Sequence, residues 1–326
     1  KPGDGYDVGE GDGKFTVARG LQEFWDRDAH SIVRGLTDPS KIPGGELNAA
    51  ALQRLDVWTD GGTRDLFNFS VDAQNLAGAF YARGRDVQYL TEFANAPGQD
   101  PKSGNFDPKY TVWEDLPGVV FQRYGATVPS QVAFDDGTGQ HVGTGSEIIE
   151  RVQSAMYFLA SRWPEPELRT LSARSKDDPA PGVAQCEIDE KCDFDFSHGG
   201  RTGPVSVALP PGYGNRFNQQ QRYPVIYFLH GYGQDPSGLS SVEALFTNWM
   251  ADPAASIATR FPKVIVVYVD GRCRWQNGKA ECLRGSFFTD SVMAQGSQDE
   301  SWWLALMDEV DRRFRTMPEG AADWTE

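Results

Sequence analysis

Residues 222–233 read Arg-Tyr-Pro-Val-Ile-Tyr-Phe-Leu-His-Gly-Tyr-Gly, an apolar run that ends in a histidine and glycines. A continuous apolar run such as Val225–Leu229 is typical of a strand that is buried on both faces of a parallel sheet. The glycines let the chain turn sharply at the carboxyl edge of the sheet, so that a backbone N–H can point into a cleft. This stretch therefore predicts a buried strand followed by an oxyanion hole, a turn that stabilises a developing negative charge.

The sequence on either side of this stretch carries further strand patterns. Residues Val205–Leu209 alternate in the manner of a half-exposed strand, and Val264–Val269 form a second continuous apolar run. Helical spacing separates these segments. Strands that alternate with helices indicate a three-layer α/β domain, which we assign to residues 204–326.

The first half of the chain shows mostly helical spacing. One helix is expected from Asp65 to Arg83, ended by Gly84, and a second from an N-cap at Ser146 to the interruption at Pro164. The first helix is expected to bury Leu66, Phe69, Ala73, Leu76, Ala77 and Phe80, and the second Ile149, Val152, Met156 and Leu159. We therefore predict a mainly helical N-terminal domain over residues 1–171 and a linker with a disulfide loop over residues 172–203.

Composition and charge narrow the class of protein. The chain has 31 Lys and Arg against 46 Asp and Glu, a formal net charge of −15 at pH 7. Binding to a phosphate backbone draws on a surplus of cations, so nucleic acid is not expected as a partner. The longest apolar run, Val264–Val269, is far shorter than the roughly 18 residues that suggest a membrane span. We expect a chain with no membrane-spanning segment.

The cysteines form two local pairs, Cys186 with Cys192 and Cys273 with Cys282. Neither pair has zinc-site spacing, and closing such short loops could contribute roughly 2 kcal/mol in the chain-entropy model. Two disulfides and a secreted or periplasmic protein are therefore predicted. Four free thiols in a cytosolic protein are the alternative. The N-terminus lacks the apolar core of a signal peptide, so a secreted protein would have been processed or trimmed before Lys1.

The N-terminal arm alternates carboxylates with glycines. Asp4, Asp7, Glu10 and Asp12 could supply oxygen ligands to a structural calcium ion, although their spacing does not match an EF-hand. The alternative is an acidic, solvated arm. No cofactor is required by the chemistry predicted below.

Several ordered motifs resemble the putative-esterase branch of the α/β-hydrolases, the group that contains esterase D, feruloyl and acetylxylan esterases and the mycolyltransferases. The motifs cover roughly residues 200–316 and are Val207–Tyr213, Leu229–Gly233, Val267–Gly271, Gly285–Asp290 and Trp302–Thr316. The resemblance implies the first half of an α/β-hydrolase domain.

The resemblance also implies roles for individual residues. The backbone N–H of Tyr232 would be an oxyanion donor, and His230, Gly231 and Gly233 would shape the substrate turn. Trp275 would lie in a loop near the cleft, where it either stacks on a ligand or packs its disulfide loop. Ser286 and Asp290 match a loop that they would brace through local hydrogen bonds.

The nucleophile of this family is not found in the sequence. No Gly-x-Ser-x-Gly elbow occurs in the chain, whereas the family places one soon after the helix that matches residues 299–315. The histidines His30, His141, His198 and His230 are interpreted as surface or structural residues. We expect the nucleophile, the acid and the base to lie in a C-terminal portion of the polypeptide that this truncated chain lacks.

The sequence thus predicts a secreted serine ester hydrolase that acts on a carboxylic ester, such as a feruloyl or acetyl ester of a polysaccharide. Its chemistry would be formation and hydrolysis of an acyl-enzyme. The alternatives are a non-catalytic binding protein on a hydrolase-like fold and an acyltransferase of the same fold.

Overall fold

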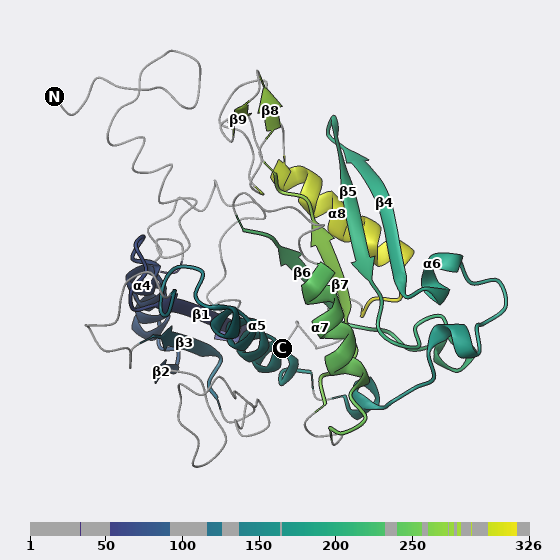
Figure 1. Cartoon of the computed structure of the whole chain (residues 1–326), viewed down its shortest axis with the longest axis horizontal. Coiled ribbons are helices and arrows are strands. Elements are labelled where there is room, and N and C mark those ends of the chain that lie inside the picture. The colour runs from purple at the N-terminus through teal and green to yellow at the C-terminus, as the bar shows by residue number, and fades with distance from the viewer. Residues whose placement is uncertain are drawn as a thin grey trace. The chain divides into compact units, whose positions relative to one another are not determined.

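A computed structural model describes residues 33, 53–91, 116–125, 137–163, 165–231, 240–255, 260–272, 274–276, 279–281, 288 and 299–317. The chain divides into two compact units, with the division between Pro164 and Glu165. We call them unit 1 and unit 2 and treat each by itself. Figure 1 shows their elements.

Unit 1 contains a parallel sheet. Its strands are β1 (Val57–Gly62), β2 (Val87–Thr91) and β3 (Val119–Tyr124), and their order in the sheet is β1-β3-β2. Val119 of the central strand is opposite Val57 on one side and Val87 on the other. Because the strands are parallel, their carboxyl ends meet at one edge of the sheet.

Two helices pack on opposite faces of this sheet. Helix α4 (Phe69–Ala82) contributes Ala77 and Phe80 to a cluster with Val119 and Phe121 of β3. The intervening residue, Val120, packs instead against Phe158 of helix α5 (Gly145–Ala160). Successive side chains of a strand point to opposite faces, so unit 1 has a helix, a sheet and a helix in layers.

The prediction of a mainly helical N-terminal domain therefore missed the parallel sheet of unit 1. Both helices are present, but their starts differ from the prediction. Asn68 takes a left-handed conformation with φ 56°, and α4 begins after it, so Leu66 stays 77% exposed. The second helix is capped by Thr144 rather than Ser146, because Thr144 and Glu147 form a reciprocal capping box. Ile149, predicted to be buried, is exposed.

Unit 2 contains a mixed four-stranded sheet. Its strands are β4 (Lys191–His198), β5 (Arg201–Ala208), β6 (Val225–Leu229) and β7 (Ile265–Val269), in the order β4-β5-β7-β6. β4 and β5 form an antiparallel hairpin, β5 and β7 are antiparallel, and β6 and β7 are parallel. β7 is buried throughout, as predicted, whereas β6 is only partly buried at the end of this strand order.

Helices also cover both faces of this second sheet. Phe228 of β6 contacts Phe246 of helix α7 (Ser240–Ala251), and the preceding Tyr227 contacts Trp303 of helix α8 (Asp299–Arg313). The mixed sheet with a helix on each face is a three-layer α/β arrangement, as predicted for this part of the chain. Shorter elements are η6 (Pro166–Arg169), η7 (Ser175–Asp177), α6 (Gln185–Ile188), η8 (Arg216–Asn218), β8 (Arg274–Gln276) and β9 (Lys279–Glu281). None of the helices in the described ranges is long and apolar enough to cross a membrane.

Residues 172–203, predicted as a linker, lie inside unit 2 and contribute β4. Glu190 fixes this segment, because its carboxylate accepts hydrogen bonds from the backbone N–H groups of Ser175 (2.9 Å) and Gly212 (2.7 Å). The predicted disulfide between Cys186 and Cys192 is confirmed, with an S–S distance of 2.07 Å. It joins α6 to β4.

Candidate functional site

The carboxyl end of β6 is held by the imidazole of His230. This side chain is buried, and its Nε2 accepts a hydrogen bond from the backbone N–H of Gly271 at 2.9 Å. Since a backbone N–H can only donate, the ring proton must be on Nδ1, which donates to the Gly231 carbonyl at 2.9 Å. Both ring nitrogens are therefore engaged. His230 links the ends of β6 and β7 through these hydrogen bonds. Because neither ring nitrogen is left to accept a proton, we assign it a structural role and not that of a general base.

The conformation at this edge also requires Gly271. A Cβ atom at this position would lie 2.3–2.6 Å from ring atoms of Phe288. The Phe288 ring packs at 5.2 Å from the His230 ring, between centroids. Gly271 thus leaves the space that lets Phe288 cover His230.

Charged groups brace the same edge. Asp270 follows β7, and Arg272 donates to both of its carboxylate oxygens at 2.9 Å. Burial raises the pKa of Asp270, but the hydrogen bonds and charge of Arg272 outweigh burial and hold that pKa below its ordinary value. Arg201, at the start of β5, donates to the Asp270 carbonyl and to the buried carboxylate of Asp299 in α8 (2.6 Å). These bonds tie β5, β7 and α8 together next to the turn.

Most of the site residues predicted from the sequence lie outside the described residues. This holds for Tyr232, Gly233, Ser286, Asp290, the cysteines Cys273 and Cys282, and the calcium candidates Asp4, Asp7, Glu10 and Asp12. Trp275 lies in β8, but its side chain is outside the description. His230 and Gly231 are the predicted turn residues whose positions are known.

The other described histidines have different surroundings. His198 is exposed at the end of β4. His141, in unit 1, has its Nδ1 3.2 Å from the buried carboxylate of Asp65. Sequence reasoning missed this pair. Each residue lies close to glycines in the sequence, Asp65 after Gly61 and Gly62 and His141 between Gly139 and Gly143, but no sequence signal pairs the two.

Comparison with known proteins supports the assignment of unit 2. Residues 198–322 match the family model described as "Putative esterase". This range contains β5, β6, β7 and α8, together with the His230 turn. The resemblance inferred from the motifs over residues 200–316 is thereby confirmed. No curated protein matches the chain.

Solved structures of two hydrolases also match. A ferulic acid esterase matches with 15% identity and a TM-score of 0.29, over 39% of this chain and 45% of that chain. An S-formylglutathione hydrolase from Agrobacterium tumefaciens matches with 14% identity and a TM-score of 0.28, over 39% of this chain and 44% of that chain. The chain spans less than half the length of either structure.

Proposed function

We propose that residues 198–322 belong to a secreted serine ester hydrolase that forms and hydrolyses an acyl-enzyme. The observation that carries the proposal is the match to the esterase family over a segment in which His230 links the ends of β6 and β7. The substrate class proposed is a carboxylic ester, such as a feruloyl or acetyl ester of a polysaccharide. The Cys186–Cys192 disulfide supports an oxidising compartment.

The proposed oxyanion donor is the backbone N–H of Tyr232. A trans peptide carries its C=O and its N–H on opposite sides. A Gly231 carbonyl that accepts a hydrogen bond from His230 favours a Tyr232 N–H that faces away from that ring. His230, Gly231 and Gly233 would then shape the turn that holds the substrate carbonyl next to this donor.

The proposed nucleophile lies in residues beyond Glu326. The chain contains no Gly-x-Ser-x-Gly elbow, and an oxyanion donor acts only on a charge that nucleophilic attack creates. The sheet offers a place for a further strand. Pro224 accepts from Ile265 of β7, whereas the neighbouring Tyr223 bonds on the other side, donating to Arg315 and accepting from Met317, each at 2.9 Å. The chain that leaves α8 thus begins a parallel bridge along that edge of β6.

The proposal also includes a ligand platform and a metal site. Trp275 would stack on an aromatic acyl group or a sugar near the cleft. The acidic arm with Asp4, Asp7, Glu10 and Asp12 would hold a structural calcium ion.

The experiment that tests the function removes one backbone donor. Tyr232→Pro deletes the N–H, and Tyr232→Phe keeps it, in a polypeptide that continues beyond Glu326. We expect kcat for methyl ferulate and p-nitrophenyl acetate to fall roughly 100- to 1,000-fold in Tyr232→Pro and to change little in Tyr232→Phe. Circular dichroism checks that both variants fold. Equal kcat values for two folded variants would contradict the proposed donor.

A further inference from the structure

Asp65 and His141 meet at the carboxyl edge of the unit 1 sheet. Asp65 follows β1 and His141 follows β3, and these two strands are neighbours. Ligands and reacting groups of parallel α/β sheets gather at this edge, because the loops that leave the strands converge there. The pair is 76 residues apart in sequence and is brought together by the sheet.

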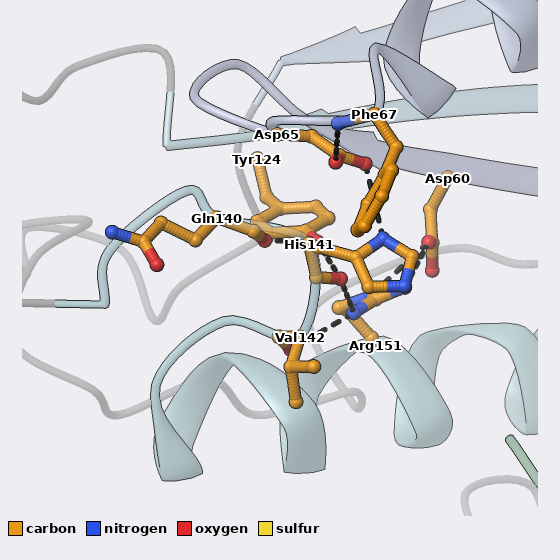
Figure 2. A network of polar contacts seen from close by, with 8 residues as sticks. All are labelled: Asp60, Asp65, Phe67, Tyr124, Gln140, His141, Val142 and Arg151. Atoms are coloured by element: carbon orange, nitrogen blue, oxygen red, sulfur yellow. Dashed lines mark hydrogen bonds and ion pairs between the residues drawn. The ribbon is translucent and has the colours of Figure 1, made fainter. Parts of the chain in front are cut away.

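The Asp65 carboxylate is arranged to orient an imidazole. Its side chain is 2% exposed, and its Oδ1 accepts the backbone N–H of Phe67 at 2.8 Å. Its Oδ2 lies 3.2 Å from His141 Nδ1 (Figure 2). The backbone bond to Phe67 keeps one oxygen in place, so the other faces the ring. This contact places the ring proton on Nδ1 when the imidazole is neutral.

The backbone around His141 is fixed by two side chains, Tyr124 and Arg151 (Figure 2). The Tyr124 hydroxyl donates to the Gln140 carbonyl at 2.8 Å, and Arg151 donates to the His141 carbonyl at 3.2 Å. Arg151 is itself paired with Asp60 at 2.6 Å. Burial raises the pKa of Tyr124 to about 12, so its hydroxyl remains a donor at neutral pH. These contacts hold the imidazole without using its second nitrogen.

The Nε2 atom of His141 lies on the open side of the ring. The side chain is 44% exposed, and among the described residues no hydrogen bond reaches Nε2. The rings of Phe67 and Phe69 flank the imidazole at 5.2 and 5.0 Å, and both phenylalanines are exposed. The rings of Phe67 and Phe69 therefore form an apolar rim beside an accessible ring nitrogen.

We propose that Asp65 and His141 form a general-base dyad that removes a proton from a hydroxyl group, for attack on a neutral acyl compound with an apolar group. Asp65 orients the ring and stabilises the imidazolium, and His141 Nε2 takes the proton. A carboxylate, an imidazole and a hydroxyl perform this chemistry on unrelated folds, where they are recognised by geometry rather than by chain order. This proposal does not depend on the esterase assignment of residues 198–322.

The proton and electron balance is complete with a hydroxyl and an ester. The O–H bond breaks as an N–H bond forms at Nε2, and the oxygen lone pair attacks the ester carbonyl carbon. When the tetrahedral intermediate collapses, the bond to the alcohol oxygen breaks, and the imidazolium returns its proton to that leaving oxygen. Asp65 remains ionised throughout. The hydroxyl belongs either to water or to a serine.

The test uses the 326-residue chain and p-nitrophenyl butyrate, whose acyl chain suits the apolar rim. We expect the rate above buffer to fall roughly 100-fold in His141→Gln, since general-base catalysis contributes about 10²- to 10⁴-fold. Asp65→Asn keeps the side-chain size and the acceptor for Phe67, and is expected to lose at least roughly tenfold. His198→Gln, at the exposed end of β4, serves as the matched control and should keep the rate.

A second measurement separates catalysis from a structural role. Nitrogen-15 NMR of His141 should show the Nδ1–H tautomer in the wild type and a loss of that preference in Asp65→Asn with the fold retained. A fluorophosphonate probe tells the two hydroxyl sources apart, because it labels an activated serine and not water. Labelling that His141→Gln abolishes indicates a serine, and His141-dependent turnover without labelling indicates water. A hydrolysis rate that does not depend on His141 in folded variants would overturn the dyad.

Discussion

At the scale of single residues, the hydrogen-bond partners of a histidine decide what it can do. His230 and His141 both follow parallel strands at a carboxyl edge. His230 has both nitrogens engaged, by the Gly271 N–H and the Gly231 carbonyl. Among the residues that the structure describes, only Nδ1 of His141 has a hydrogen-bond partner, which is Asp65. His230 therefore has a structural role, whereas His141 has a ring nitrogen that can take part in the proposed proton transfer.

A substitution at Gly271 tests the packing of Phe288 over His230. In Gly271→Ala the new Cβ would overlap the Phe288 ring, so Phe288 must leave its position over His230. We expect the free energy of unfolding to fall by about 1–3 kcal/mol, measured by urea denaturation. Gly78→Ala is the control, because nothing lies within 4 Å of a Cβ at that helical position. The control should be unchanged or more stable by about 0.5–1 kcal/mol. A Gly271→Ala variant as stable as the wild type would contradict the packing described.

Lys263 provides a prediction for pH dependence. Its side chain is buried, its Nζ lies 2.6 Å from Ser172 Oγ, and burial lowers its pKa from 10.5 to about 8. Between pH 8 and 10.5 the unfolded state binds more protons at this lysine than the folded state does. The contribution of Lys263 to the free energy of unfolding therefore rises with pH across this range and is lost as the pH falls through 8. Lys263→Met removes the cost of burying the charge. We expect the variant to exceed the wild type by up to about 3 kcal/mol at pH 7.

The advantage of Lys263→Met should shrink as the pH rises toward 10.5. Other titrating groups cancel when the two urea-denaturation series are subtracted. Parallel stability curves for the two proteins would show that Lys263 keeps its ordinary pKa in the folded state.

At the scale of elements, sequence patterns predicted the helices and strands that are determined by residues close together in the chain. The buried run in β7 and the helical spacing of α4 and α5 were readable, because each depends on neighbours along the chain. The strands of unit 1 were missed because they are short and lie among loop-like sequence. The Asp65–His141 pair was missed because its 76-residue separation is closed by the pairing of β1 with β3.

The hairpin of β8 and β9 carries the second cysteine prediction. Cys273 immediately precedes β8 and Cys282 immediately follows β9, and these two strands are antiparallel. Antiparallel pairing brings flanking residues close together, so a disulfide between Cys273 and Cys282 is expected beside the one between Cys186 and Cys192. Peptide mapping without reduction should recover both bonds. Four alkylatable thiols in the native protein would contradict the oxidising compartment.

At the scale of the whole molecule, the two units carry separate candidate sites, and each site has its own proposal. Unit 2 carries the esterase-family segment and its fixed turn, and the proposal adds a nucleophile beyond Glu326. Unit 1 carries an imidazole and the carboxylate that orients it at the edge of its own sheet. The ordered motifs in the sequence predicted the esterase-family segment of unit 2. The Asp65–His141 pair of unit 1 could be found only from the three-dimensional structure, because no motif in unit 1 links Asp65 to His141.

The central claim is that the esterase segment acts through a serine outside these 326 residues, and active-site labelling tests it most directly. A fluorophosphonate probe is reacted with residues 1–326 and with the polypeptide that continues beyond Glu326, and the labelled peptide is identified by mass spectrometry. We predict stoichiometric labelling of one serine beyond Glu326 in the longer polypeptide and none within residues 1–326. Stoichiometric labelling of a serine within residues 1–326 would contradict the claim, and its loss in His141→Gln would place the nucleophile with the unit 1 dyad instead.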